Sequence, residues 1–138
     1  MNFLVDTNVL SESSKPAPDP KIAAWLHAHK DRAYVSSISL GELAYGVERL
    51  PHGRKRSALE AWLETMRQSL KGRILPFNSA VAIEWGRLVA ALEKAGQPMP
   101  TVDSQIAATA RRHGLTLVTR NEEDFRHGGV RLLNPFES

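Results

Sequence analysis

The chain has 138 residues, no cysteine and a formal net charge of +3. This length fits one domain, residues 1–138, with a single sizeable core, and the lack of cysteine excludes disulfides and thiolate metal sites. No apolar stretch approaches the length of a membrane span, and Asp6 interrupts the apolar run near the N-terminus, so neither a membrane helix nor a signal peptide is expected.

Strands and helices are predicted to alternate along the chain. The apolar run that ends at Asp6 is typical of a buried strand in a parallel sheet, and Asp19 followed by Pro20 is typical of a helix start. Such alternation predicts a three-layer α/β/α domain with a mainly parallel central sheet. After the first strand we expect helices at 20–30, 39–50, 54–70, 79–95 and 101–113, and strands at 33–36, 73–75, 115–119 and 130–133.

Four acidic residues stand where a strand ends or a helix begins, namely Asp6, Glu42, Asp103 and Asp124. Because strand carboxyl ends and helix starts meet at one edge of a parallel α/β sheet, these carboxylates could meet in space. Carboxylates held together repel one another unless a divalent cation neutralises them. Oxygen ligands with no His or Cys nearby favour magnesium or manganese over zinc, and such a site can activate water for phosphodiester hydrolysis.

Each acid also has a purely structural interpretation. Asp6 could accept hydrogen bonds from the turn that follows it. Glu42 completes the pattern Ser39-x-x-Glu42, which is typical of a capping box. Asp103 near a helix start would favour the helix macrodipole, and Asp124 could be one more solvated charge in a loop.

Basic residues gather in one stretch, at Arg49, Arg54, Lys55 and Arg56. A basic surface favours a polyanionic partner through phosphate contacts and counterion release. The alternative is a solvated helical face that only keeps the protein in solution.

Short motifs spread over nearly the whole chain resemble those of the PIN-domain family, and in particular a VapC-type toxin of the FitB branch. They include the opening block Phe3 to Glu12, the block Val35 to Leu43 and the block Asp103 to Ala110. Leu117-Val118-Thr119-Arg120-Asn121 with Asp124-Phe125, and Leu132 to Phe136, complete the set.

The resemblance implies a metal-dependent endoribonuclease. Asp6 and Asp103 match the aspartates that bind Mg²⁺, for which Mn²⁺ could substitute, and Glu42 matches the third acid. Asn121 stands where many relatives carry Asp, and Asp124 supplies an acid just beyond it, so either could complete the site. Further matches are Thr7 and Ser37, as possible supporting residues, and the basic residues Arg49, Arg54, Lys55 and Arg120 as possible RNA-binding residues.

The same resemblance implies how the protein would act and assemble. RNA would be cleaved by metal-activated water, which leaves a 5′-phosphate and a 3′-hydroxyl. A cognate antitoxin would inhibit the protein, within a homodimer and a toxin–antitoxin hetero-oligomer that reaches operator DNA only through the antitoxin. We expect no membrane partner and a cytoplasmic, prokaryotic setting.

Two other functions fit part of the pattern. A phosphatase could use Asp6 as a nucleophile, but that class needs a second Asp two positions on, where this chain has Asn8. A non-enzymatic binding module would need no acidic site, and the presence of Asp6, Glu42 and Asp103 argues against it.

Overall fold

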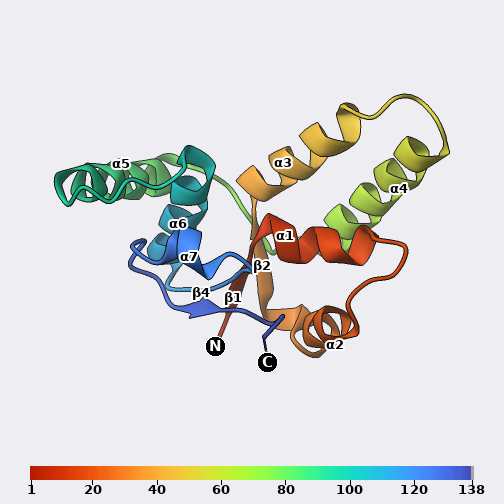
Figure 1. The fold of residues 1–138 in the computed structure, drawn as a ribbon, viewed down its shortest axis with the longest axis horizontal. Coiled ribbons are helices and arrows are strands. Elements are labelled where there is room, and N and C mark those ends of the chain that lie inside the picture. The colour runs from red at the N-terminus through yellow and green to blue at the C-terminus, as the bar shows by residue number, and fades with distance from the viewer. Residues whose placement is uncertain (138) are drawn as a thin grey trace.

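The structure, a computed structural model, describes residues 1–137; Ser138, the last residue of the expected domain, lies outside the described residues. Helices cover both faces of a central sheet (Figure 1). The strands are β1 (Phe3–Val5), β2 (Ala33–Ser36), β3 (Ile74–Leu75), β4 (Thr116–Val118) and β5 (Leu132–Leu133). The helices are α1 (Thr7–Leu10), α2 (Pro20–Ala28), α3 (Ser37–Glu48), α4 (Arg54–Ser69), α5 (Ser79–Lys94), α6 (Thr101–His113) and α7 (Glu122–Phe125), with the short 3-10 helices η1 (Ser11–Ser14) and η2 (Lys30–Arg32).

The sheet has five strands in the order β3-β2-β1-β4-β5, and every neighbouring pair is parallel. The chain builds outward from β1 through β2 to β3, and then returns to the other side of β1 with β4 and β5. The order therefore reverses between β1 and β4. In open α/β sheets, the crevice outside the strand carboxyl ends at such a reversal is the usual place for a site.

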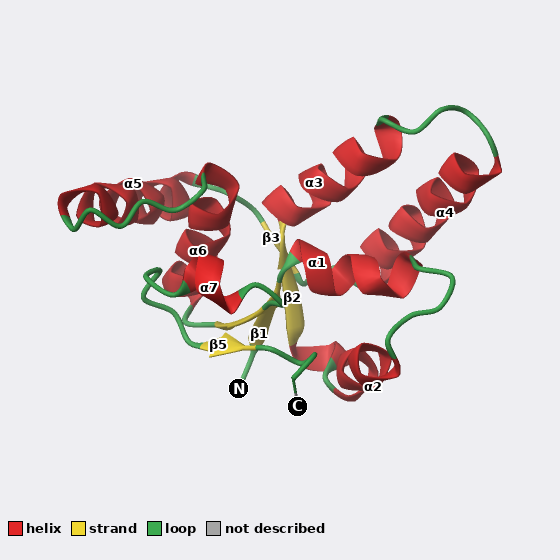
Figure 2. Ribbon diagram, in the orientation of Figure 1, coloured by secondary structure: helices red, strands yellow, loops and turns green. Residues whose placement is uncertain are grey.

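Alternation along each strand divides the core between two faces. Phe3 and Val5 of β1 pack into the cluster that also holds residues of α1 to α4, whereas Leu4 between them packs with α5, α6 and α7. The same period of two separates Val118 from Leu117 in β4, as the pleat of a strand requires. Both faces are covered, so the predicted three-layer α/β/α architecture with a parallel sheet is confirmed (Figure 2).

The predicted elements are found, with differences at their ends. The strand at 33–36 and the helix at 101–113 have the expected bounds, and Asp19 caps α2 by accepting a hydrogen bond from the backbone N–H of Lys21 at 2.9 Å. Helix α5 begins at Ser79, and Asn78 caps it by accepting a hydrogen bond from the backbone N–H of Val81 at 3.1 Å. Within residues 1–137, no helix is long and apolar enough to cross a membrane.

Candidate active site

Asp6 follows β1 directly and lies 5% exposed at the carboxyl edge of the sheet. Its backbone N–H continues the sheet by donating to the carbonyl oxygen of Val118 in β4, at 2.8 Å. The carboxylate is held from two sides, because Oδ1 accepts the N–H of Thr7 at 2.8 Å and Oδ2 accepts the hydroxyl of Thr119 at 2.8 Å. Burial raises the pKa of Asp6 above its ordinary value, although these two hydrogen bonds oppose the rise.

Asn8 and Thr119 form a polar bridge between the ends of β1 and β4, which sequence reasoning did not find. The amide nitrogen of Asn8 donates to Asp6 Oδ2 at 3.2 Å and to Thr119 Oγ1 at 3.4 Å. Its amide oxygen accepts the N–H of Arg120 at 3.1 Å, and Thr119 Oγ1 accepts the N–H of Asn121 at 3.1 Å. Asn8 therefore links the buried carboxylate to the segment that leads into α7.

Glu42 reaches the site from α3, through a hydrogen bond at 2.6 Å in which the hydroxyl of Thr7 donates to Glu42 Oε1. The capping-box interpretation of Glu42 is wrong, because α3 begins at Ser37 and its cap is Ser36, whose Oγ accepts the N–H of Ile38 at 3.1 Å. Ser39 is fully buried in the first turn, and its hydroxyl has no hydrogen-bond partner among residues 1–137. Glu42 is thus free of a helix-capping role and contacts the residue next to Asp6.

Asp103 and Asp124 complete the acidic group from α6 and α7. Asp103 stands in the first turn of α6, half-buried, and its carboxylate makes no hydrogen bond or ion pair with residues 1–137. Burial raises the pKa of Asp103 to about 6, helped by the negative charges of Asp6, Asp124 and Glu42. The four carboxylates, from four different elements, are therefore close enough to repel one another.

We call the sheet edge that holds Asp6, Glu42, Asp103 and Asp124 the acidic edge. Its donor set fits a hard divalent cation. It offers carboxylate oxygens, and the hydroxyl of Thr7 donates a hydrogen bond to the carboxylate of Glu42. It contains no cysteine ligand because the chain has no cysteine. In residues 1–137, no three Asp, Glu or His side chains are gathered tightly enough to form a ready-made cation cage. Burial raises the pKa of Asp103, and the neighbouring negative charges add to the rise; a bound cation would offset both effects.

The remaining predicted residues lie at different distances from the acidic edge. Thr7 orients Glu42, whereas Ser37 accepts the N–H of Phe77 at 3.1 Å and so holds the connection after β3. The side chain of Asn121 is exposed and makes no hydrogen bond within the described chain. After burial, the negative charge of Asp124 is one of the smaller causes that raise the pKa of Asp6 and the pKa of Asp103.

The predicted basic residues do not form one cluster beside the acids. Arg120 follows β4, next to the site, with its guanidinium 4.2 Å from the ring centre of Phe136. Arg54 and Lys55 begin α4, at the far end of the α3–α4 pair from the sheet (Figure 1). Arg56 forms ion pairs with Glu48 and Glu60, at 3.0 and 3.5 Å.

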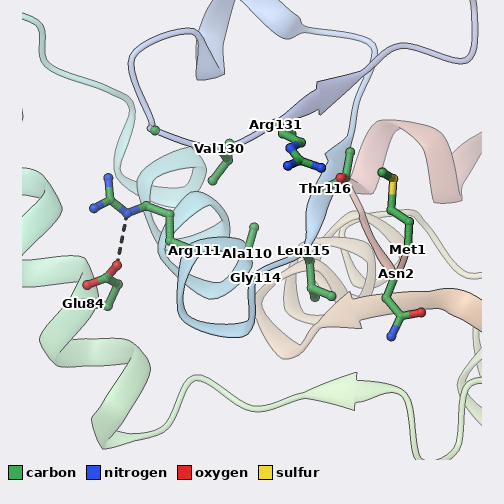
Figure 3. A pocket seen from close by; sticks show the side chains of 11 residues that line it. Met1, Asn2, Glu84, Ala110, Arg111, Gly114, Leu115, Thr116, Val130 and Arg131 are labelled. Atoms are coloured by element: carbon green, nitrogen blue, oxygen red, sulfur yellow. Dashed lines mark hydrogen bonds and ion pairs between the residues drawn. The ribbon is translucent and has the colours of Figure 1, made fainter.

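A broad hollow of the described surface lies at the opposite edge of the sheet from the acids. Its volume is about 820 Å³, and its walls include Asn2 before β1 and Thr116 at the start of β4. Figure 3 shows this hollow, with Arg111 of α6 paired to Glu84 of α5 at 3.1 Å. It contains none of the four acids and only one carboxylate, so its chemistry differs from that of the acidic edge.

Comparisons with known proteins cover nearly the whole chain. The PIN domain family model matches residues 3–129. "VapC ribonuclease Y4jK" of Sinorhizobium fredii is 35% identical over 98% of this chain and 98% of its own length. "Toxin FitB" of Neisseria gonorrhoeae is 36% identical, over 97% of this chain and 98% of its own length.

Two solved structures show how far the fold is shared. The crystal structure of FitAcB from Neisseria gonorrhoeae matches with a TM-score of 0.92 at 36% identity, covering 99% of each chain. DNA-bound VapBC from Salmonella typhimurium matches with a TM-score of 0.83 at 29% identity, covering 98% of each chain.

Proposed function

This chain belongs to the PIN-domain family, and from that premise we propose that it is a Mg²⁺-dependent endoribonuclease toxin of a toxin–antitoxin module. Relatives named as a VapC ribonuclease and as the toxin FitB match 98% and 97% of the chain, at 35% and 36% identity. Their names support an RNA-cleaving toxin. The metal dependence and the mechanism are our own proposal, and they depend on the acidic edge.

The observation that carries the proposal is the convergence of four carboxylates from separate elements. Asp6 follows the central strand, and burial together with the charges of Asp6, Asp124 and Glu42 raises the pKa of Asp103 to about 6. A protein that only binds a partner has no need to keep such mutually repelling charges together, since the repulsion costs stability. Carboxylates in this arrangement are suited to a metal-dependent nuclease.

Asp6 and Asp103 are the residues that would hold the cation. Asp103 has no competing partner within residues 1–137, and Asp6 is fixed by Thr7 and Thr119, so both present carboxylate oxygens without rearrangement of a hydrogen-bond network. A bound Mg²⁺ supplies positive charge that stabilises a phosphodiester transition state and lowers the pKa of water. The structure supports carboxylate ligation, and Mn²⁺ would satisfy the same donor set.

The chain's own residues account for the proton transfer. Glu42, oriented by Thr7, accepts the proton of the water that attacks the phosphorus atom. The bond from phosphorus to the 3′-oxygen breaks on the opposite side, and the leaving oxygen takes up a proton from solvent. The products are a 5′-phosphate and a 3′-hydroxyl. Asp124 would add negative charge beside Asp6 and Asp103, and Arg120 would contact the RNA backbone next to the site.

The proposed partner is a cognate antitoxin that silences the toxin within a hetero-oligomer. Its support comes from the likeness to FitAcB and to DNA-bound VapBC, which matches at a TM-score of 0.83. Contact with operator DNA would be made through the antitoxin, and a homodimer of this chain would form the core of the assembly.

The first experiment is cleavage of total cellular RNA by purified, antitoxin-free protein. Reactions contain Mg²⁺, Mn²⁺ or EDTA, and Asp6→Asn and Asp103→Asn serve as matched variants that remove one charge each. Discrete fragments with 5′-phosphates that disappear in EDTA and in both variants are expected. Full activity in EDTA, or full activity of Asp103→Asn with Mg²⁺, would contradict the proposal, provided that circular dichroism shows the variants folded.

A further inference from the structure

Helix α3 carries a stripe of side chains that leads away from the acidic edge. Glu42, Tyr45 and Arg49 stand three and seven positions apart, so they lie along one side of the helix. Its opposite side is buried through Leu43 and Val47. Because each residue adds 1.5 Å, Tyr45 stands about 4.5 Å and Arg49 about 10 Å beyond Glu42 along the axis. Figure 2 shows α3 rising from the end of β2 and away from the sheet.

Tyr45 is exposed in a way that the fold does not explain. It keeps 64% of its surface exposed, and among the large hydrophobic residues that are exposed in residues 1–137 it is the only aromatic one. The guanidinium carbon of Arg49 lies 5.2 Å from the centre of the Tyr45 ring. Arg49 therefore covers one face of this ring. An exposed aromatic ring beside an arginine combines a stacking surface with a phosphate contact, and proteins bind unpaired RNA with this combination.

We propose that Tyr45 is a base-stacking residue of the RNA-binding surface, on which an unpaired base of the substrate stacks while Arg49 contacts a neighbouring phosphate. The inference rests on the proposed ribonuclease function, because it places RNA along α3 from the scissile phosphate at Glu42 outward. The base would stand about one helical turn from the catalytic carboxylate. The enzyme would then select unpaired RNA over duplex RNA, in which the bases are already stacked on one another.

The test measures binding of a fluorescein-labelled single-stranded RNA of about 12 nucleotides, by anisotropy in EDTA, where metal-dependent cleavage cannot occur. Tyr45→Ala is expected to weaken binding about tenfold, whereas Tyr45→Phe keeps the ring and should remain within about twofold. Ile83→Ala is the matched control, since Ile83 is also exposed, at 56%, and lies on α5. It should bind RNA like the unchanged protein.

Salt dependence separates stacking from charge. Tyr45→Ala should leave the slope of log affinity against log salt unchanged, whereas Arg49→Gln should reduce that slope by about 1. Duplex RNA of the same length should lose less than about twofold in affinity with Tyr45→Ala, because its bases are not available for stacking. Unchanged affinity of Tyr45→Ala for single-stranded RNA, or an equal loss with Tyr45→Phe, would overturn the proposal.

Three further outcomes keep this inference distinct from others. Sedimentation velocity of each variant tests whether Tyr45 instead joins two copies of the chain, and a change of mass with Tyr45→Ala would overturn the proposal in favour of that interface. If the protein cuts RNA in a metal-dependent manner but Tyr45→Ala leaves KM unchanged, stacking fails and the ribonuclease function stands. If RNA binds through Tyr45 but is never cut, stacking stands and the ribonuclease function fails.

Discussion

At the scale of single residues, the acidic edge contains two different kinds of carboxylate. Asp6 accepts hydrogen bonds on both oxygens, including one from the hydroxyl of the fully buried Thr119. Asp103 accepts none within the described chain, and its pKa rises to about 6. Removing the charge of Asp103 should therefore relieve repulsion without leaving a donor unpaired, whereas Asp6→Asn would turn an amide group toward Asn8 or Thr7.

We expect the metal-free protein to gain thermal stability as the pH falls from about 7 to about 5. The folded-state pKa of Asp103 lies above its ordinary value of 3.8, so the folded state binds this proton more tightly than the unfolded chain. The stability that this group contributes is complete below pH 3.8 and is lost as the pH rises through about 6. Because Asp103 is only half-buried, solvent screening limits the effect to about 3 °C.

Calorimetry of the protein and of Asp103→Asn in EDTA checks this prediction. The variant should have the higher Tm at neutral pH, and its advantage should shrink as the pH falls through about 6, where Asp103 in the folded protein takes up its proton. Taking the difference between two proteins cancels the titration of groups elsewhere. A constant difference at every pH would contradict the raised pKa.

Asn8→Ala should lower kcat, and it should raise the Mg²⁺ concentration needed for half-maximal activity by about tenfold. The change removes the donor to Asp6 and the acceptor of the Arg120 N–H, so it loosens the carboxylate and the segment before α7 together. Asn134→Ala is a matched control, because Asn134 donates to the Arg120 carbonyl at 3.2 Å but does not contact Asp6. An equal change in the Mg²⁺ requirement of both variants would show that Asn8 acts only through the loop.

At the scale of elements, Arg111 joins three parts of the face formed by α5 and α6. From α6 it pairs with Glu84 of α5 at 3.1 Å and donates to the carbonyl oxygen of Gly128 at 3.3 Å, in the loop before β5. Gly129 has a φ of +67° and approaches Arg111 so closely that a Cβ would stand 2.6 Å from its guanidinium nitrogen. Gly114, which ends α6, has a similar φ of +64° with open space around it.

The pair Gly129→Ala and Gly114→Ala isolates the contribution of this contact. Both changes force a non-glycine residue into the left-handed region, which costs about 1 kcal/mol. Only Gly129→Ala also displaces Arg111, so we expect it to lower the free energy of unfolding by about 1 kcal/mol more. Urea denaturation measures both values. In an Arg111→Ala background the difference should disappear, and a difference that persists would show that Arg111 adds nothing.

The sequence predicted elements best where the local chemistry was unambiguous. Helix α6 combines acid near its start, Arg111, Arg112 and His113 in its last turn, and Gly114 just beyond it, and its bounds were predicted without error. Helix α3 was misplaced because Ser39 and Glu42 imitate a capping box, whereas Ser36 at the end of β2 caps the helix. Helix α7 was missed because it is only four residues long.

The candidate site was predictable in its acids and not in the residues that support them. The carboxylates stand at element ends, which a sequence displays. The bridge between Asn8 and Thr119 joins residues 111 positions apart, and it exists only because β1 and β4 are neighbours. Polar residues at the ends of two apolar runs, with Thr119 directly after the second, were the one available signal.

At the scale of the whole molecule, the acidic edge draws on both faces of the sheet. Asp6 follows β1, Glu42 belongs to the α3 side, and Asp103 and Asp124 belong to the α6 and α7 side. The two clusters of buried residues share that single sheet, so we expect them to unfold in one transition. A cation bound at this edge would therefore stabilise the entire fold.

Mg²⁺ should raise the Tm of the protein, and the gain should grow with concentration as mass action requires. At one hundred times the dissociation constant the stabilisation is about 2.7 kcal/mol. Thermal scans over a series of Mg²⁺ concentrations measure the gain, with Asp103→Asn as the variant that removes a proposed ligand. A gain of the same size in Asp103→Asn would contradict metal binding by this residue, whatever the outcome of the cleavage assays.

The central position of β1 has a consequence for synthesis of the chain. This strand leaves the ribosome first, yet one of its two neighbours, β4, is made more than one hundred residues later, at Thr116–Val118. Synthesis at about 5–20 residues per second leaves an unfinished chain for several seconds with this side of β1 unpaired and with Asp103 and Asp124 absent or unplaced. Under the proposed mechanism, the nascent chain would therefore be unable to cut RNA until α6, β4 and α7 have been made and placed.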